Sequence, residues 1–138
     1  MKAFIDTSSL IKKYIDEKGS DQFNVLLKQI SEIILSPFCL LELNSVFQRR
    51  LKEKTLNIDQ VSSILTELKR DLPYFNRIHW NDHLEQKALE LIQKYQIRTL
   101  DSLQLASGCL ADADVFITSD QKLYQAAKKE LHNVKLIL

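Results

Sequence analysis

The sequence contains very little glycine, proline or cysteine, with two residues of each among 138. A β-sandwich or β-barrel with many tight turns normally needs more glycine and proline, so this scarcity favours a mainly helical chain with a few short strands. The two cysteines, Cys39 and Cys109, form no CxxC pair and are too few for a disulfide framework. No apolar run approaches the ~18 residues of a membrane span, and the amino terminus does not resemble a signal peptide. We therefore expect a cytoplasmic protein with free thiols and no membrane contact.

An excess of charge of either sign is also absent. Nineteen basic and eighteen acidic residues give a formal net charge of +1. This balance argues against a protein that binds nucleic acid through bulk positive charge, but it leaves a local basic patch open. The apolar share of 45% and the charged share of 27% are typical of a globular protein. The length predicts a single domain over residues 1–138.

Short apolar segments alternate along the chain with longer amphipathic ones. Strands are expected at residues 3–5, 33–35, 76–80, 115–118 and 134–138. Helices are expected from Thr7 or Ser8 to 15, from Asp21 to 30, from Pro37 to 54, from Asn57 or Asp59 to Pro73, from Asn81 or Asp82 to 95, from 100 to 111 and from 120 to 131. This alternation predicts an α/β fold whose central sheet is parallel and covered by helices on both faces.

Four acidic residues stand at unusual positions in this pattern. Asp6 directly ends the first strand, and Asp120 follows the fourth. In open parallel sheets, active sites lie beyond the carboxyl ends of the strands, so neighbouring strands would bring these two acids to one edge. Glu42 falls on a largely apolar helix face, which is unfavourable for an unpaired carboxylate. Asp101 begins a helix, where attraction to the helix dipole is an equally good explanation.

Convergence of these acids would require a cation. Two carboxylates about 4 Å apart repel by roughly 4 kcal/mol at an effective dielectric constant near 20. Oxygen ligands suit Mg²⁺ or Mn²⁺, and one or two such ions would support hydrolysis of a phosphodiester. The three histidines follow no zinc-binding spacing, and no glycine-rich phosphate-binding motif is present. A metal-dependent phosphatase on a similar fold is a further possibility.

Four segments together resemble the PIN domain family, and most closely the VapC-type toxins of toxin–antitoxin systems. They are FIDTSSLIK at 4–12, LELNS at 41–45, RTLDSLQLA at 98–106 and VFITSDQKL at 115–123. The resemblance extends over essentially the whole chain. It implies a three-layer fold with about five parallel strands, and a metal-dependent ribonuclease. It also matches the acidic metal-binding quartet of the family, the catalytic residues, to Asp6, Glu42, Asp101 and Asp120.

The resemblance further implies supporting residues and partners. Thr7 matches a hydroxyl residue that supports the first aspartate, and Thr118 or Ser119 is expected to support the last. A homodimer is implied, together with a small antitoxin whose carboxyl-terminal segment covers the acidic groove. An RNA-binding or scaffold protein without turnover, or an RNA-processing factor without a toxin role, is the alternative.

RNA contact requires local positive charge beside the acidic groove. The candidates are Lys12, Arg49, Arg50 and Arg98. Arg49 lies two turns beyond Glu42 on the same expected helix, which places it near the proposed site.

Overall fold

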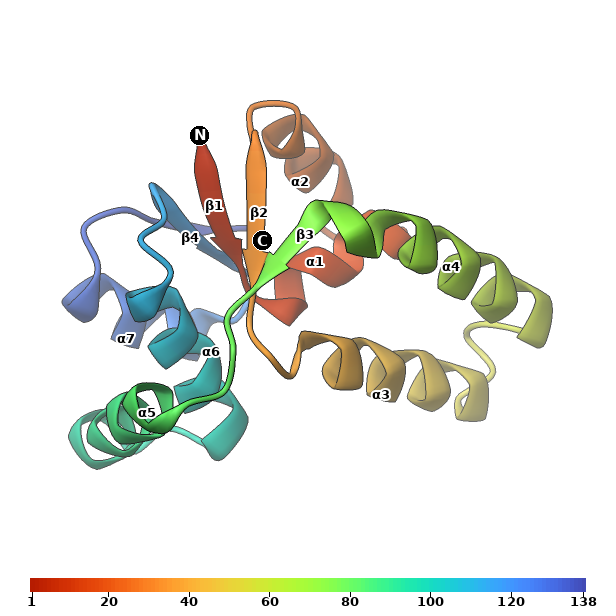
Figure 1. The fold of residues 1–138 in the computed structure, drawn as a ribbon. Helices are drawn as coiled ribbons and strands as arrows, with labels where there is room; N and C mark the ends of the chain where they lie inside the picture. Colours follow the sequence, from red (N-terminus) through yellow and green to blue (C-terminus); the bar gives the residue numbers. More distant parts are fainter.

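The computed structural model describes all 138 residues, and its strands and helices alternate as predicted (Figure 1). In chain order the elements are β1 (Lys2–Ile5), α1 (Thr7–Tyr14), α2 (Ser20–Leu27), β2 (Glu32–Leu35), α3 (Cys39–Lys52), α4 (Ile58–Asp71), the short 3-10 helix η1 (Leu72–Tyr74), β3 (Phe75–Arg77), α5 (Asp82–Tyr95), α6 (Thr99–Leu110), β4 (Val115–Thr118), α7 (Gln121–Glu130) and β5 (Val134–Leu136).

The five strands form one parallel sheet in the order β3-β2-β1-β4-β5. β1 is the central strand. The chain adds β2 and β3 on one side of it and then returns to add β4 and β5 on the other. The order therefore switches between β1 and β4, and such a switch point is where open α/β sheets form their binding crevice.

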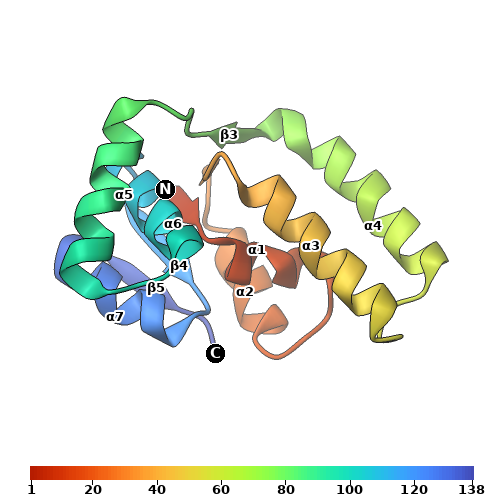
Figure 2. The ribbon, with the colours of Figure 1, turned by 90° about the horizontal axis from the view of Figure 1, so that it is seen from below.

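Helices cover both faces of the sheet, so the predicted three-layer α/β fold is confirmed. α1 to α4 lie on one face and α5 to α7 on the other (Figure 2). Side chains of β1 alternate between the two cores: Ala3 and Ile5 belong to the first, whereas Phe4 belongs to the second. The helices that follow β1 and β4 leave on opposite faces, which opens the crevice between these strands at their carboxyl ends.

α6 lies very close to the sheet because Gly108 faces the ring of Phe116. A Cβ atom at position 108 would lie 2.5 Å from Cε2 of Phe116, well inside van der Waals contact. The ring cannot easily move, since it stacks on Phe4 with ring centroids 5.2 Å apart. Residues 102–108 are all buried. The position of α6, and of the polar side chains on it, is therefore closely defined.

Several element ends differ from the sequence predictions. α1 has Asp6 at its N-cap position rather than Thr7 or Ser8, and the Asp6 side chain makes no capping hydrogen bond. α2 begins at Ser20 after Gly19, whose φ of 90° suits glycine, rather than at Asp21. The third strand spans Phe75–Arg77 rather than 76–80, because η1 leads directly into it.

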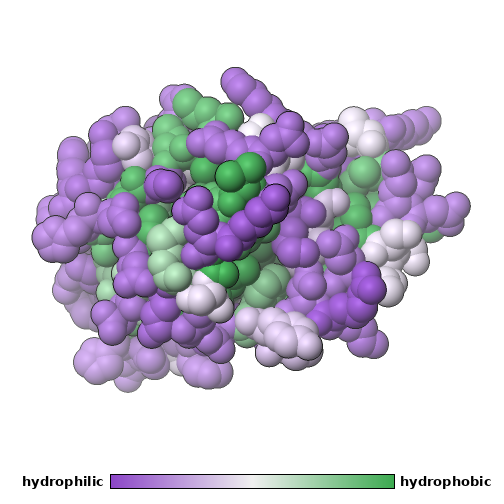
Figure 3. All heavy atoms as spheres, turned by 90° about the horizontal axis from the view of Figure 1, so that it is seen from above, coloured by the Kyte–Doolittle hydropathy of each residue, from purple (hydrophilic) through white to green (hydrophobic).

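The face at the amino ends of the strands lies opposite the crevice. Hydrophilic residues cover most of it, with hydrophobic residues visible between them (Figure 3). None of the helices is long and apolar enough to cross a membrane.

Candidate functional site

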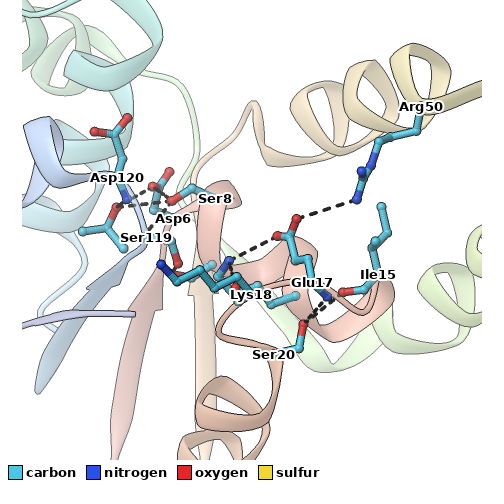
Figure 4. A network of polar contacts seen from close by, with 12 residues as sticks. Asp6, Ser8, Ile15, Glu17, Lys18, Ser20, Arg50, Ser119 and Asp120 are labelled. Carbon is cyan, nitrogen blue, oxygen red and sulfur yellow. Dashed lines mark hydrogen bonds and ion pairs between the residues drawn. The ribbon is translucent and has the colours of Figure 1, made fainter. Parts of the chain in front are cut away.

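The carboxyl ends of β1 and β4 bring together Asp6 and Asp120, the first and the last of the four candidate acids. Ile5 and Ile117 are register partners, and the Asp6 backbone N–H continues the ladder by donating to the Ile117 carbonyl at 2.9 Å. Asp120 follows β4 and caps α7, where its Oδ1 accepts from the Leu123 N–H at 3.0 Å. The two carboxylates thus stand on either side of the switch point (Figure 4).

A groove of about 640 Å³ lies at this edge. Its walls include all four predicted acids together with several cations and apolar residues: Asp6, Glu42, Asp101, Asp120, Arg49, Arg50, Arg98, Leu41 and Leu100. A second cavity of similar volume, about 670 Å³, lies between the end of α1 and the α3–α4 turn and contains none of these four carboxylates. The first groove is therefore the candidate site.

Asp6 is the most buried of the four acids. Its Oδ2 accepts hydrogen bonds from Ser8 Oγ at 2.5 Å and from Thr118 Oγ1 at 2.8 Å. Burial raises the pKa of Asp6 from 3.8 to about 6, although the two hydroxyl donors oppose this rise. Repulsion from Asp101 and Asp120 contributes to the same rise in pKa. These acids are therefore close enough to interact.

Glu42 enters the groove from α3 and is held by two donors. Gln104 Nε2 donates to Glu42 Oε1 at 2.6 Å, and Thr7 Oγ1 lies 3.3 Å from the same oxygen. Burial raises the pKa of Glu42 from 4.5 to about 7, and the Gln104 hydrogen bond opposes this effect. Repulsion from Asp6 and Asp101 also raises the pKa.

The contacts of the hydroxyl residues agree only in part with those that the resemblance implied. Thr7 contacts Glu42 rather than Asp6, because its side chain leaves the first turn of α1 toward α3 and α6. Thr118 supports the first aspartate, and its oxygen also accepts from the backbone N–H of Asp120 at 3.1 Å. The backbone N–H of Ser119 donates to Ser8 Oγ at 2.9 Å, so Ser119 acts on Asp6 only through Ser8.

Asp101 lies in the first turn of α6. Its Oδ2 accepts from Arg98 Nε at 3.3 Å, and the Arg98 side chain is 84% exposed. An ion pair this exposed is worth little, so Arg98 is free to exchange partners.

Lys12 does not lie on the groove. It is 8% exposed, and its Nζ donates to Glu17 Oε1 at 3.2 Å and to the Lys18 carbonyl at 2.7 Å. Glu17 also pairs with Arg50 at 3.8 Å, so this network connects α1, the following loop and α3 (Figure 4). The structure therefore gives Lys12 partners within the chain rather than a place on the groove, because the loop after α1 folds back and uses its charge. Arg49, Arg50 and Arg98 remain on the groove.

The four carboxylates share one property that bears on metal binding. In each, one oxygen accepts hydrogen bonds from the protein and the other accepts none: the unpartnered atoms are Oδ1 of Asp6, Oε2 of Glu42, Oδ1 of Asp101 and Oδ2 of Asp120. No three acidic, histidine or cysteine side chains lie close enough together in this structure to hold a metal ion. The donor chemistry still suits a hard divalent cation, because each acid keeps one carboxylate oxygen available in a common groove.

Ser8 and Gln104 contribute to the site but are absent from the sequence predictions. A lone serine or glutamine carries no sequence signal of its own. The only indication is that Gln104 falls three residues after Asp101, on the same face of its helix.

Comparison with known proteins agrees with the resemblance found in the sequence. A family model described as PIN domain matches residues 3–129. The fold is similar to that of a toxin–antitoxin complex from Klebsiella pneumoniae, with 19% identity, a TM-score of 0.70 and coverage of 99% of this chain and 98% of that one.

Two further solved structures are similar at the level of the fold. VapBC2 from Rickettsia felis, bound to a DNA fragment from its promoter, is 14% identical with a TM-score of 0.70 and coverage of 99% and 98%. FitAcB from Neisseria gonorrhoeae is 14% identical with a TM-score of 0.67 and coverage of 96% and 95%. No curated protein sequence matches this chain.

Proposed function

The chain belongs to the PIN domain family, whose members are generally nucleases that use divalent metal ions, and on this premise we propose that it is a metal-dependent endoribonuclease. We further propose that it is the toxin of a toxin–antitoxin pair. The observation that carries the proposal is the groove of four carboxylates, each with one oxygen anchored by the protein and one oxygen free.

The residues proposed to hold Mg²⁺ or Mn²⁺ are Asp6, Glu42, Asp101 and Asp120. One or two such ions, when bound, would make the attacking water more acidic and stabilise the charge on the leaving oxygen. The protein's own part is to orient the ligands. Ser8 and Thr118 anchor Oδ2 of Asp6, which turns its other oxygen away from the hydroxyl cluster.

The basic residues of the groove are proposed to contact RNA phosphates. Arg49 and Arg98 have exposed side chains on opposite walls, α3 and the start of α6. Phosphate contacts fix the register of a nucleic acid without reading its sequence, so these residues would place the backbone across the carboxylates.

An antitoxin is proposed to cover the same groove. Leu41 and Leu100 line it from α3 and α6, and their side chains are 68% and 48% exposed. Exposed leucines beside an acidic groove suit a protein segment that combines apolar side chains with a basic one. The Klebsiella pneumoniae relative is a toxin–antitoxin complex, which supports this interpretation. A homodimer in the cytoplasm remains a prediction.

Cleavage of total cellular RNA with Mn²⁺ tests the proposal. Wild type is compared with Asp101→Asn and with Asp59→Asn, a matched control that removes a first-turn acid from α4, outside the groove. We expect discrete fragments from wild type and Asp59→Asn, and none from Asp101→Asn or in EDTA. Equal cleavage by all three proteins would refute the site. A wild type that binds Mn²⁺ and RNA without cleaving would favour a binding or scaffold protein.

A further inference from the structure

Gln104 joins three helices at the edge of the proposed site. It lies on α6, one turn after Asp101, and is 1% exposed. Its Nε2 donates to Glu42 Oε1 at 2.6 Å and to Thr7 Oγ1 at 2.9 Å. A single amide group therefore links α6 to α3 and α1.

Glu42 depends on this link more than on any other contact. No salt bridge in the structure includes Glu42, so no cation holds its side chain. Its one other protein donor is Thr7, which is more distant, at 3.3 Å, and also lies 3.3 Å from Cys39 Sγ. The Gln104 amide is therefore the shortest restraint on the carboxylate.

Packing alone does not explain a glutamine at this position. Gln104 Oε1 is buried and has no hydrogen-bond partner. An unpartnered buried acceptor is unfavourable, and an apolar side chain of similar volume, such as leucine, would avoid it. The benefit of the glutamine must lie in what its Nε2 does.

We propose that Gln104 is a positioning residue for the metal site. It holds Oε1 of Glu42 so that Oε2 stays available in the groove, and it ties Glu42 to the helix that carries Asp101. This inference rests on the proposed metal-dependent function. Residues that orient ligands in this way typically change metal affinity by 10–100-fold when they are removed.

The test compares Gln104→Leu with Ser107→Ala. Ser107 is one turn further along α6, is buried, and has a hydroxyl without a partner, so its removal alters the same helix without touching Glu42. Mn²⁺ affinity is measured by the electron paramagnetic resonance signal of free Mn²⁺, and the melting temperature is measured in EDTA. Steady-state RNA cleavage separates kcat from KM.

We expect Gln104→Leu to bind Mn²⁺ about tenfold more weakly. Its melting temperature in EDTA should change little, because loss of the unpartnered Oε1 offsets the loss of the donor to Glu42. Its kcat should fall with the same KM for RNA. Ser107→Ala should match wild type in all these measurements. Wild-type affinity in Gln104→Leu, or equal losses in both variants, would overturn the positioning role. A wild type that binds no Mn²⁺ would instead refute the proposed function itself.

Discussion

Replacing Asp6 by asparagine is expected to stabilise the metal-free fold at neutral pH while abolishing cleavage. The amide oxygen of asparagine can accept the same hydrogen bonds from Ser8 and Thr118 that Oδ2 accepts now, at 2.5 and 2.8 Å. The substitution therefore removes one buried charge with little change in shape. It also removes the repulsion that Asp6 experiences from Asp101 and Asp120.

The size of the effect follows from the pKa of Asp6, which burial raises from 3.8 to about 6. A change of this size corresponds to about 3 kcal/mol, and the cost of burying an amide reduces the expected gain to about 1–3 kcal/mol. Because the folded pKa is higher than the unfolded one, the stability that Asp6 contributes is complete below about pH 4 and is lost as the pH rises through 6. The advantage of asparagine should therefore be small at pH 4 and fully developed at pH 7.

Thermal denaturation in EDTA at pH 4 and pH 7 measures this difference. For a chain of this size we expect the melting temperature of Asp6→Asn to exceed that of wild type by about 3–9 °C at pH 7. Saturating Mn²⁺ should narrow or reverse the gap, because it binds the wild type more tightly. A variant that melts below wild type at pH 7, or gains equally at pH 4, would refute the reasoning.

Asp71 provides a control of opposite sign. It accepts hydrogen bonds from Lys13 Nζ at 2.8 Å and Tyr14 Oη at 2.7 Å. Burial raises the pKa of Asp71, but these hydrogen bonds outweigh it and lower the pKa. The stability that Asp71 contributes is thus present above the unfolded pKa and is lost as the pH falls through the folded one. Asp71→Asn should therefore melt below wild type at pH 7.

Two further predictions concern α6 and the basic wall of the groove. Gly108→Ala should destabilise the protein by about 1–3 kcal/mol, because the added methyl group clashes with Phe116 and outweighs a helix propensity gain of about 1 kcal/mol. An unchanged midpoint of urea denaturation would contradict this prediction. Arg49→Ala, introduced into the Asp101→Asn protein, should weaken binding of a labelled RNA and lower the slope of log affinity against log salt by about 1. The control Arg70→Ala, which removes an exposed arginine from α4 outside the groove, should leave that slope unchanged. Fluorescence anisotropy at several salt concentrations measures both, and equal slopes for the two variants would show that Arg49 makes no phosphate contact.

The fold and two of the site residues were predictable because their signals are local. Each short apolar segment and its flanking helix can be identified within ten or so residues, and Asp6 and Asp120 are next to strand ends. Parallel pairing then places them at one edge without further information. Glu42 and Asp101 needed the family resemblance, since each has an ordinary structural explanation when taken alone.

The partners of individual side chains were not predictable, because they depend on how distant helices pack. Thr7 is next to Asp6 in sequence but donates toward α3, whereas Thr118 reaches Asp6 from another strand. In the sequence Lys12 is a candidate for RNA contact, and only the path of the loop to Gly19 explains its burial. The sequence shows Gln104 only as a helical residue, and its contact with Glu42 follows from the packing of α6 beside α3.

The strand order has a consequence for the newly made chain. β1 can pair with β2 soon after both are synthesised, but the groove also needs β4, and the Asp6–Thr118 contact joins residues 112 positions apart. At ~5–20 residues per second, roughly 6–23 seconds pass between synthesis of the first and the last acid of the groove. Contacts this distant in sequence form late in folding. The acidic groove that we propose cleaves RNA is therefore not assembled beside the ribosome until β4 has been made and has docked beside β1.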